Sequence, residues 1–95
     1  QSKDVLVDDT MLAPGYGSPS SEVFAAVHKA ARMEALLFDP VYTGRGFAGL
    51  INLVNTGAIQ RGEKVLFIHT GGTPGIFAYQ QEIVASAPKS PSANP

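Results

Sequence analysis

The sequence predicts an α/β fold, an open parallel sheet with covering helices. Short apolar runs of strand length alternate with stretches that have the apolar spacing of a helix. Glycine-rich turns separate many of these segments. The apolar run at 63–70 shows no alternation of polar and apolar residues, which is typical of a parallel strand covered on both faces. We therefore expect one domain part at 1–86 and a disordered tail at 87–95.

The first third is predicted as a strand followed by a helix. Residues 4–9 (DVLVDD) have the length and apolar content of a short strand. A helix is expected over about 19–34, because Ser18 offers an N-cap and Pro19 suits the first helical position. From Val23 onward the helix face repeats at spacings of three and four residues.

The middle is predicted as a second strand and a second helix. ALLFD at 35–39 is a brief apolar run that Pro40 ends, because proline disfavours helical backbone at the residue before it. A helix is expected over 45–56, with Gly57 as its C-terminal stop. Four apolar residues mark its buried face: Phe47, Leu50, Ile51 and Val54.

The last third is predicted as a strand, a short helix and a tail. EKVLFIHT at 63–70 is the third strand, ended by Gly71 and Gly72. Residues 74–81 form a last helix in this prediction. The proline- and serine-rich end lacks apolar periodicity, so disorder is expected from 87 to 95.

The composition excludes several classes of function. A net charge of −1 gives no basic face for nucleic acid or an anionic membrane. The chain has no cysteine and two isolated histidines, so no metal site is expected. No run approaches a membrane span, and we expect the protein in the cytoplasm or in an organelle. Charged residues make up 16%, against roughly 25% in soluble domains, which indicates part of a longer protein.

Two glycine-rich loops are the first candidates for a binding site. TGRG at 43–46 and TGGTPG at 70–75 each place glycines and a hydroxyl before a predicted helix, where backbone amides favour an anion such as phosphate. Neither loop has a known phosphate-loop spacing, and tight turning for steric reasons explains such glycines equally. Both interpretations stay open on local chemistry alone. His69, at the predicted strand end, is interpreted first as a hydrogen-bonded core residue.

Three blocks carry a family resemblance. PGYG at 14–17, DPVYTGRGFAGLINLV at 39–54 and GEKVLFIHTGGTPGIFAY at 62–79 resemble the C-terminal segment of the pyridoxal-phosphate enzymes that comprise D-cysteine desulfhydrase and 1-aminocyclopropane-1-carboxylate deaminase. The resemblance implies the tryptophan-synthase β-like fold (fold type II), with this segment in the larger domain. It also implies a homodimer and a small amino-acid substrate. The cofactor phosphate would be held by an earlier loop, so the loops here would approach the pyridine ring.

The resemblance assigns roles to five residues. Tyr42 would bind the substrate amine or move a proton, and Tyr16 would position it. Thr70 would be the hydroxyl partner of the pyridine nitrogen, with Thr43 as its neighbour and Gly71 beside the cofactor. Without the resemblance, two tyrosines that pack near turns would be an equal interpretation of the phenols.

The threonines also decide between subfamilies. YTG at 42–44 and HTGG at 69–72 resemble the desulfhydrase type. The deaminase type instead has sequences similar to YEG and HLGG at these places, and its glutamate favours a protonated pyridine nitrogen. The implied reaction is β-elimination from D-cysteine to pyruvate, hydrogen sulfide and ammonia. Deaminase and cysteate lyase activities of the same family are alternatives.

The catalytic set is incomplete in this segment. Arg45 stands where the family usually has lysine, a difference that we expect to affect a surface or loop contact. No lysine here lies in a motif for the Schiff base, so the chain alone is expected to be inactive without the remainder of the enzyme. A non-catalytic binding or structural piece is therefore the third hypothesis.

Overall fold

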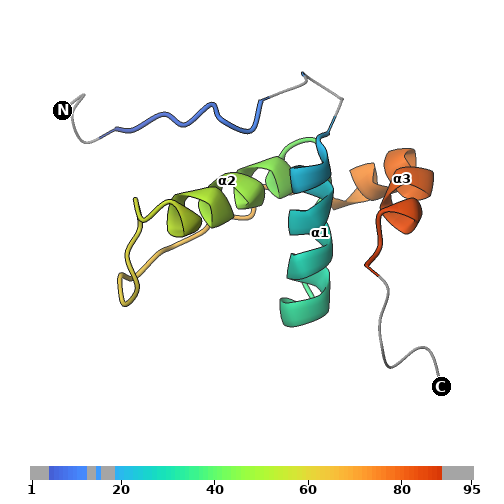
Figure 1. Ribbon diagram of the computed structural model, residues 1–95. Coiled ribbons are helices and arrows are strands. Elements are labelled where there is room, and N and C mark those ends of the chain that lie inside the picture. The colour runs from blue at the N-terminus through green and yellow to red at the C-terminus, as the bar shows by residue number, and fades with distance from the viewer. Residues whose placement is uncertain (1–4, 13–14, 16–18, 89–95) are drawn as a thin grey trace.

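A computed structural model describes residues 5–12, 15 and 19–88, and all regular structure within them is helical (Figure 1). The elements are α1 (Ser21–Glu34), α2 (Thr43–Asn55), the 3-10 helix η2 (Thr73–Tyr79) and α3 (Gln80–Ala85). No strand occurs among these residues, so the predicted α/β fold with an open parallel sheet is wrong. The described part is a small helical domain.

The predicted strands do not form because the described residues provide no neighbouring strand with which they could pair. In the described part of 4–9, and across 63–70, the backbone is neither helical nor assigned to a strand. Most of their apolar side chains are exposed, Leu6 to 91% and Leu66 to 87%, and Phe67 packs against the core. An apolar run becomes a strand only where a neighbouring strand takes its backbone hydrogen bonds and a packed layer covers its faces. Neither is provided by the described part of this chain.

The first predicted helix is confirmed with a shifted start. α1 begins at Ser21, and its N-cap is Ser20, whose hydroxyl oxygen accepts a hydrogen bond from the Val23 backbone N–H at 3.3 Å. Ser18, the predicted cap, lies outside the described residues. The helix ends at Ala35, which adopts the left-handed conformation with φ 56°. This geometry lets the Leu36 N–H donate to the Ala30 carbonyl at 3.2 Å.

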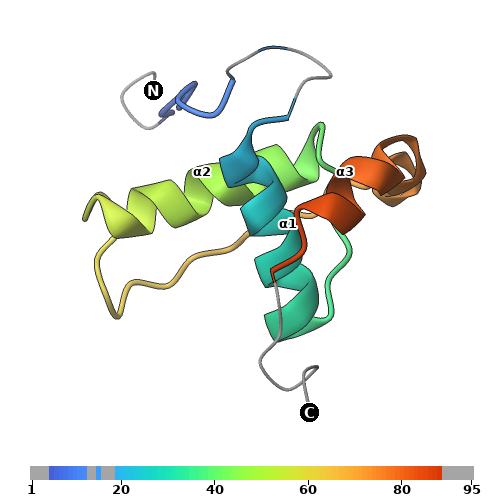
Figure 2. The ribbon, with the colours of Figure 1, turned by 45° about the vertical axis from the view of Figure 1, so that its right-hand side comes forward.

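The second predicted helix is also confirmed, beginning two residues earlier than expected. α2 runs from Thr43 to Asn55, and Gly57 follows its end with φ 85°, the stop role predicted for it. In both ribbon views α2 crosses α1 near the α1 N-terminus (Figures 1 and 2). The two helices pack through small and apolar residues: Val23, Ala26 and Ala48 are buried, and Phe47 and Ile51 pack against them.

The core is small and partly aromatic. Phe38, 1% exposed, lies between α1 and α2, although it belongs to the predicted strand at 35–39. Its ring centroid lies 5.2 Å from that of Phe47 and 5.6 Å from that of Phe67. Such aromatic pairs contribute about 0.5–1.5 kcal/mol beyond their buried area. The segment at 35–39 is therefore a connection between two helices in which Phe38 and Asp39 are buried and Leu36 and Leu37 are exposed.

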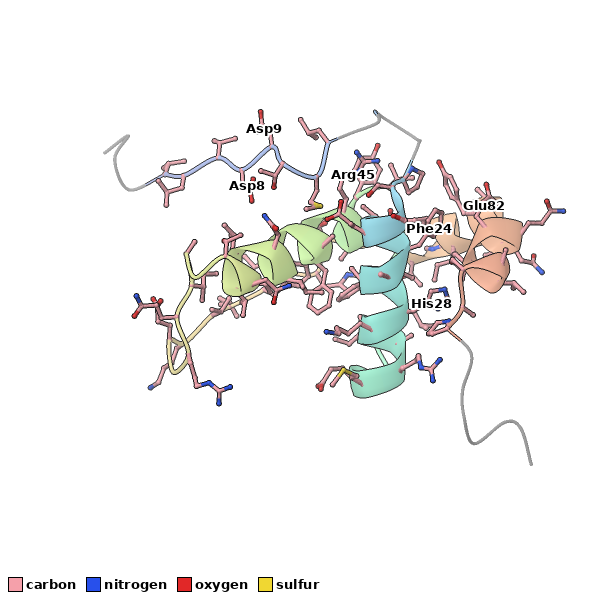
Figure 3. The ribbon with its side chains drawn as sticks, in the orientation of Figure 1. Asp8, Asp9, Phe24, His28, Arg45 and Glu82 are labelled. Atoms are coloured by element: carbon pink, nitrogen blue, oxygen red, sulfur yellow. The ribbon has the colours of Figure 1, made fainter. Side chains whose placement is uncertain are left out.

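The last predicted helix is confirmed in place and extended in length. η2 and α3 together run from Thr73 to Ala85, against the predicted 74–81. The α3 end contacts α1 through His28, whose Nε2 lies 2.8 Å from the Ile83 carbonyl oxygen, and Figure 3 shows His28 directed toward this end. Arg32 donates to the Pro88 carbonyl at 3.2 Å, so the described start of the predicted tail is held against α1. Residues 89–95 of that tail lie outside the described residues.

Candidate functional site

The turn before α2 is organised by a buried carboxylate. Asp39 is 2% exposed, and its side-chain oxygens accept hydrogen bonds from three successive backbone N–H groups. These belong to Val41 at 2.9 Å, Tyr42 at 2.7 Å and Thr43 at 3.0 Å. The Asp39 carbonyl oxygen also accepts from the Gly44 N–H at 2.7 Å. Asp39 thus caps α2 and satisfies amides that would otherwise be unpaired at the helix start.

This carboxylate bears on the phosphate interpretation of the TGRG loop. Of the α2 amides that a phosphate could use, those of Thr43 and Gly44 already bind the carboxylate and the carbonyl oxygen of Asp39. A Cβ added at Gly72, whose φ is 85°, would lie 2.9 Å from Asp39 Oδ1. A Cβ at Gly44 would lie 2.5 Å from the Asp39 carbonyl oxygen. These two glycines therefore have a packing reason, which favours the steric interpretation of both loops.

A hydrogen bond joins the two loops. Thr43 is 4% exposed, and its hydroxyl donates to the Gly71 carbonyl oxygen at 2.9 Å across 28 residues of sequence. The Gly71 N–H in turn donates to His69 Nδ1 at 3.1 Å. The imidazole of His69 stacks edge-on to Phe38, with ring centroids 5.0 Å apart. His69 is thus hydrogen-bonded as expected, but it is exposed and does not belong to the core.

A cavity of about 680 Å³ lies between α2 and the segment at 5–12. Tyr42 and Thr70, two of the five predicted site residues, both line it. Thr43 and Gly71 are not among the lining residues, because they face each other at the junction of the loops. Tyr16 lies outside the described residues. The structure thus brings Tyr42 and Thr70 to one cavity and gives Thr43 and Gly71 a structural contact beside it.

Arg45 holds in place the residues of the N-terminal segment that line the cavity. Its guanidinium donates to three backbone carbonyls, those of Met11 at 3.0 Å, Leu12 at 2.6 Å and Gly15 at 3.1 Å. Figure 3 shows Arg45 at the start of α2, under the N-terminal segment that carries Asp8. The predicted loop contact of Arg45 is confirmed. A planar guanidinium suits this task because its donors diverge toward several acceptors, whereas lysine presents a single ammonium.

Asp8 adds an anion to the cavity wall. Its carboxylate accepts from the Thr10 N–H at 3.0 Å and from the Thr10 hydroxyl at 2.7 Å. The backbone hydrogen bond, followed by the hydroxyl, lowers the pKa of Asp8 below its ordinary value of 3.8. Asp8 is therefore negatively charged at neutral pH.

Sequence reasoning missed Asp39, which organises the whole site. The signal was present, because aspartate followed by proline favours a turn whose side chain binds backbone amides two to four residues later. The prediction instead placed Asp39 at the end of a strand.

Two further kinds of group, lysines and metal ligands, bear on what the cavity could bind. Neither Lys29 nor Lys64 lines the cavity. Within the described ranges, no group of three or more histidine, aspartate or glutamate side chains is arranged to bind a metal ion. In the same part of the chain, every helix is too short or too polar to cross a membrane. No protein-family model matches the sequence.

Proposed function

We propose that the chain is the C-terminal segment of a pyridoxal-phosphate-dependent lyase that converts D-cysteine to pyruvate, hydrogen sulfide and ammonia. The observation that supports this function is the meeting of the two motif loops. Tyr42 of the first loop and Thr70 of the second line one cavity, and the Thr43–Gly71 hydrogen bond holds the loops together.

The residues here fit one side of the cofactor. The Tyr42 phenol is 60% exposed and the Thr70 hydroxyl is exposed, so both are accessible from the cavity that they line. Neither described lysine lines that cavity, and the amides at the α2 N-terminus are occupied by Asp39. The attachment lysine and the phosphate site would therefore come from the remainder of the enzyme.

The roles of this chain's residues follow from their chemistry. The bound cofactor supplies the electron withdrawal that labilises the bonds at the substrate Cα. Tyr42 would bind the substrate amine or transfer a proton through its phenol oxygen. Thr70 would donate or accept a hydrogen bond at the pyridine nitrogen, and Arg45 would hold Met11, Leu12 and Gly15, which line the cavity. Thr43 would act as a positioning residue.

The surroundings of position 43 favour the desulfhydrase over the deaminase for this chain. The Thr43 side chain is buried, its N–H binds the Asp39 carboxylate, and its hydroxyl binds the Gly71 carbonyl oxygen. A glutamate at 43 would bring a second carboxylate beside Asp39 and remove the donor to Gly71. Burial of a like charge at this distance is costly, so the threonine suits the present turn better.

The proposal is tested in the longer protein that contains this segment. Sulfide and pyruvate release from D-cysteine should fall at least about 100-fold in Tyr42→Phe, the loss expected for one acid–base group. Tyr79→Phe removes a phenol that does not line the cavity and is the matched control. Thr70→Val is compared in the same way with Thr56→Val at the exposed end of α2. Turnover of another β-substituted amino acid, with none of D-cysteine, would reject the substrate assignment.

A non-catalytic binding or structural piece is the second candidate. It is favoured by the large apolar side chains that lie in solvent, including Val7 at 90% and Leu66 at 87% exposure. It predicts that Tyr42→Phe and Tyr79→Phe have the same effect on every measured property. A cofactor absorbance band that depends on Tyr42 would reject it.

A further inference from the structure

Thr70 lies between two anchored neighbours. On one side, the Gly71 carbonyl oxygen accepts a hydrogen bond from the Thr43 hydroxyl at 2.9 Å. On the other side, the His69 ring packs edge-on against the buried ring of Phe38, with centroids 5.0 Å apart. The Gly71 N–H also donates to His69 Nδ1 at 3.1 Å, which closes a turn around Thr70. The backbone of Thr70 is therefore held from both sides.

The segment at 69–73 is also anchored at both of its ends. The Leu37 carbonyl oxygen accepts a hydrogen bond from the Thr73 hydroxyl at 3.0 Å. The same oxygen lies 3.5 Å from His69 Nε2. Because one carbonyl group meets both ends, the segment is fastened to the connection that leads from α1 to α2.

The Thr70 side chain is the one in this turn that is left for a ligand. The Thr43 and Thr73 hydroxyls and the His69 nitrogens are engaged by protein groups. Among the residues that the structure describes, none forms a hydrogen bond with the Thr70 hydroxyl, which belongs to a cavity-lining residue. A hydroxyl can donate and accept, so this turn offers the cavity a bonding group on a fixed backbone.

The hydrogen bonds of His69 define the state of its ring. Nδ1 accepts from the Gly71 N–H and so carries no proton, which places the proton of the neutral imidazole on Nε2, toward the Leu37 carbonyl oxygen. His69 thus contributes two separable properties, an acceptor at Nδ1 and a ring against Phe38. A phenylalanine supplies a ring without the acceptor. An asparagine supplies the acceptor without the ring, because its side-chain oxygen commonly binds the N–H two residues later.

We propose that His69 is a positioning residue for Thr70, because its Nδ1 holds the turn that directs the Thr70 hydroxyl to the pyridine nitrogen. The inference rests on the proposed function for the partner of Thr70, whereas the hold on the turn does not depend on it. His69 does not line the cavity and touches no reacting atom in this role.

Two variants of the longer protein test the hold on the turn. Amide hydrogen exchange at Gly71 should accelerate in His69→Phe, which removes the acceptor, and should stay near the wild-type rate in His69→Asn, which keeps one. A Gly71 amide that stays slow in His69→Phe, or that accelerates as much in His69→Asn, would overturn the proposal.

A double-mutant cycle tests whether His69 acts through Thr70. His69→Phe should lower sulfide release from D-cysteine at least about fivefold when Thr70 is present, and less than about twofold in the Thr70→Val background. His69→Phe and Thr70→Val should also move the absorbance maximum of the bound cofactor in the same direction, and His69→Asn should leave both readouts near wild type. His28→Phe, the same substitution at the other histidine of the chain, is the control and should combine additively with Thr70→Val.

These readouts distinguish a failure of the inference from a failure of the proposed function. Equal effects of His69→Phe in the two backgrounds would overturn the positioning role. If Thr70→Val changes neither sulfide release nor the absorbance band, while the Gly71 amide accelerates in His69→Phe, the hold on the turn stands and the role of Thr70 at the pyridine nitrogen is wrong. The exchange and absorbance measurements need no turnover, so they decide the inference even where the D-cysteine assignment fails.

Discussion

The connection at 36–39 and the segment at 65–68 have similar sequences but differ in how much of each is buried. LLFD and VLFI were both predicted as strands. Phe38 and Asp39 are 1% and 2% exposed, whereas Leu66 and Ile68 are 87% and 70% exposed. Within the first segment, which joins two crossing helices, Phe38 enters the core between them, while Leu36 and Leu37 are 43% and 57% exposed. In the second segment, Phe67 is the side chain that packs against the core. The comparison indicates that the burial of an apolar residue depends more on its neighbours in space than on its own hydrophobicity.

The largest expected effect comes from a truncation in each segment. Phe38→Ala should lower the free energy of unfolding by about 3–4 kcal/mol, because it removes a ring that packs on Phe47 and Phe67. Leu66→Ala should change it by less than about 0.5 kcal/mol, since that side chain is exposed. Urea unfolding followed by circular dichroism at low protein concentration measures both. Equal losses would mean that Leu66 is buried.

The close contacts around Gly44 provide a test of how tightly the turn before α2 is packed. In Gly44→Ala the new methyl group would lie 2.6 Å from Val27 Cγ2 and 2.5 Å from the Asp39 carbonyl oxygen. We expect a loss of about 2–3 kcal/mol from overpacking. Gly46 lies two residues further along α2, and a Cβ added there would lie 3.9 Å from the Phe67 ring, an ordinary contact distance. Gly46→Ala should therefore stabilise the helix by about 0.5–1 kcal/mol. Thermal unfolding of both variants separates the two outcomes, and a stable Gly44→Ala variant would refute the packing argument.

Removal of the cap tests the polar side of the same turn. Asp39→Ala leaves three backbone N–H groups without their acceptor and should cost about 2 kcal/mol. Asp9→Ala, at an exposed position in the N-terminal segment, should cost close to nothing and serves as the control. Amide hydrogen exchange at Tyr42 and Thr43 should accelerate in the first variant alone. Unchanged protection would mean that the cap contributes little.

A smaller effect is expected at the end of α1. Ala35 adopts a left-handed conformation, which costs an alanine about 1 kcal/mol and costs glycine almost nothing. Ala35→Gly should therefore raise stability by about 0.5–1 kcal/mol, measured by thermal unfolding. Ala25→Gly, in the exposed middle of α1, should lower stability by a similar amount and is the matched control. A loss in both variants would contradict the assigned backbone geometry.

The smallest effect concerns acid pH at the N-terminal segment. Hydrogen bonds from Thr10 hold the pKa of Asp8 below 3.8, so the Thr10 contact favours the folded turn when Asp8 is ionised. That contribution is fully present above the unfolded pKa and is lost as the pH falls below about 4 through the lowered folded pKa. Carboxyl NMR titration should detect the lowered value, and Thr10→Ala should raise it toward 3.8. An Asp8 titration that Thr10→Ala leaves unchanged would exclude this cause.

The sequence predicted the helices well because their signals are local. The apolar spacing of Phe47, Ile51 and their neighbours, and the glycine at 57, depend only on nearby residues. The strands were mispredicted because an apolar run carries no information about which segment would pair with it. Tyr42 and Thr70, two of the predicted site residues, line one cavity, and their chemical roles stay a prediction. The three contacts of Arg45 could not be predicted, because they depend on how backbone 30 to 34 residues away meets α2, whereas the Asp39 contacts are local and were missed.

The hydrogen bond from Thr43 to Gly71 has a consequence for the order of folding. The contacts of Asp39 with the backbone of residues 41–44 span at most five residues, so this turn is local and can form within microseconds. The Thr43–Gly71 contact closes a loop of 28 residues, for which the chain-entropy cost is about 3 kcal/mol. We therefore expect the turn at Asp39 to form before the second loop docks on Thr43, so that the cavity wall that carries Thr70 is assembled after the start of α2.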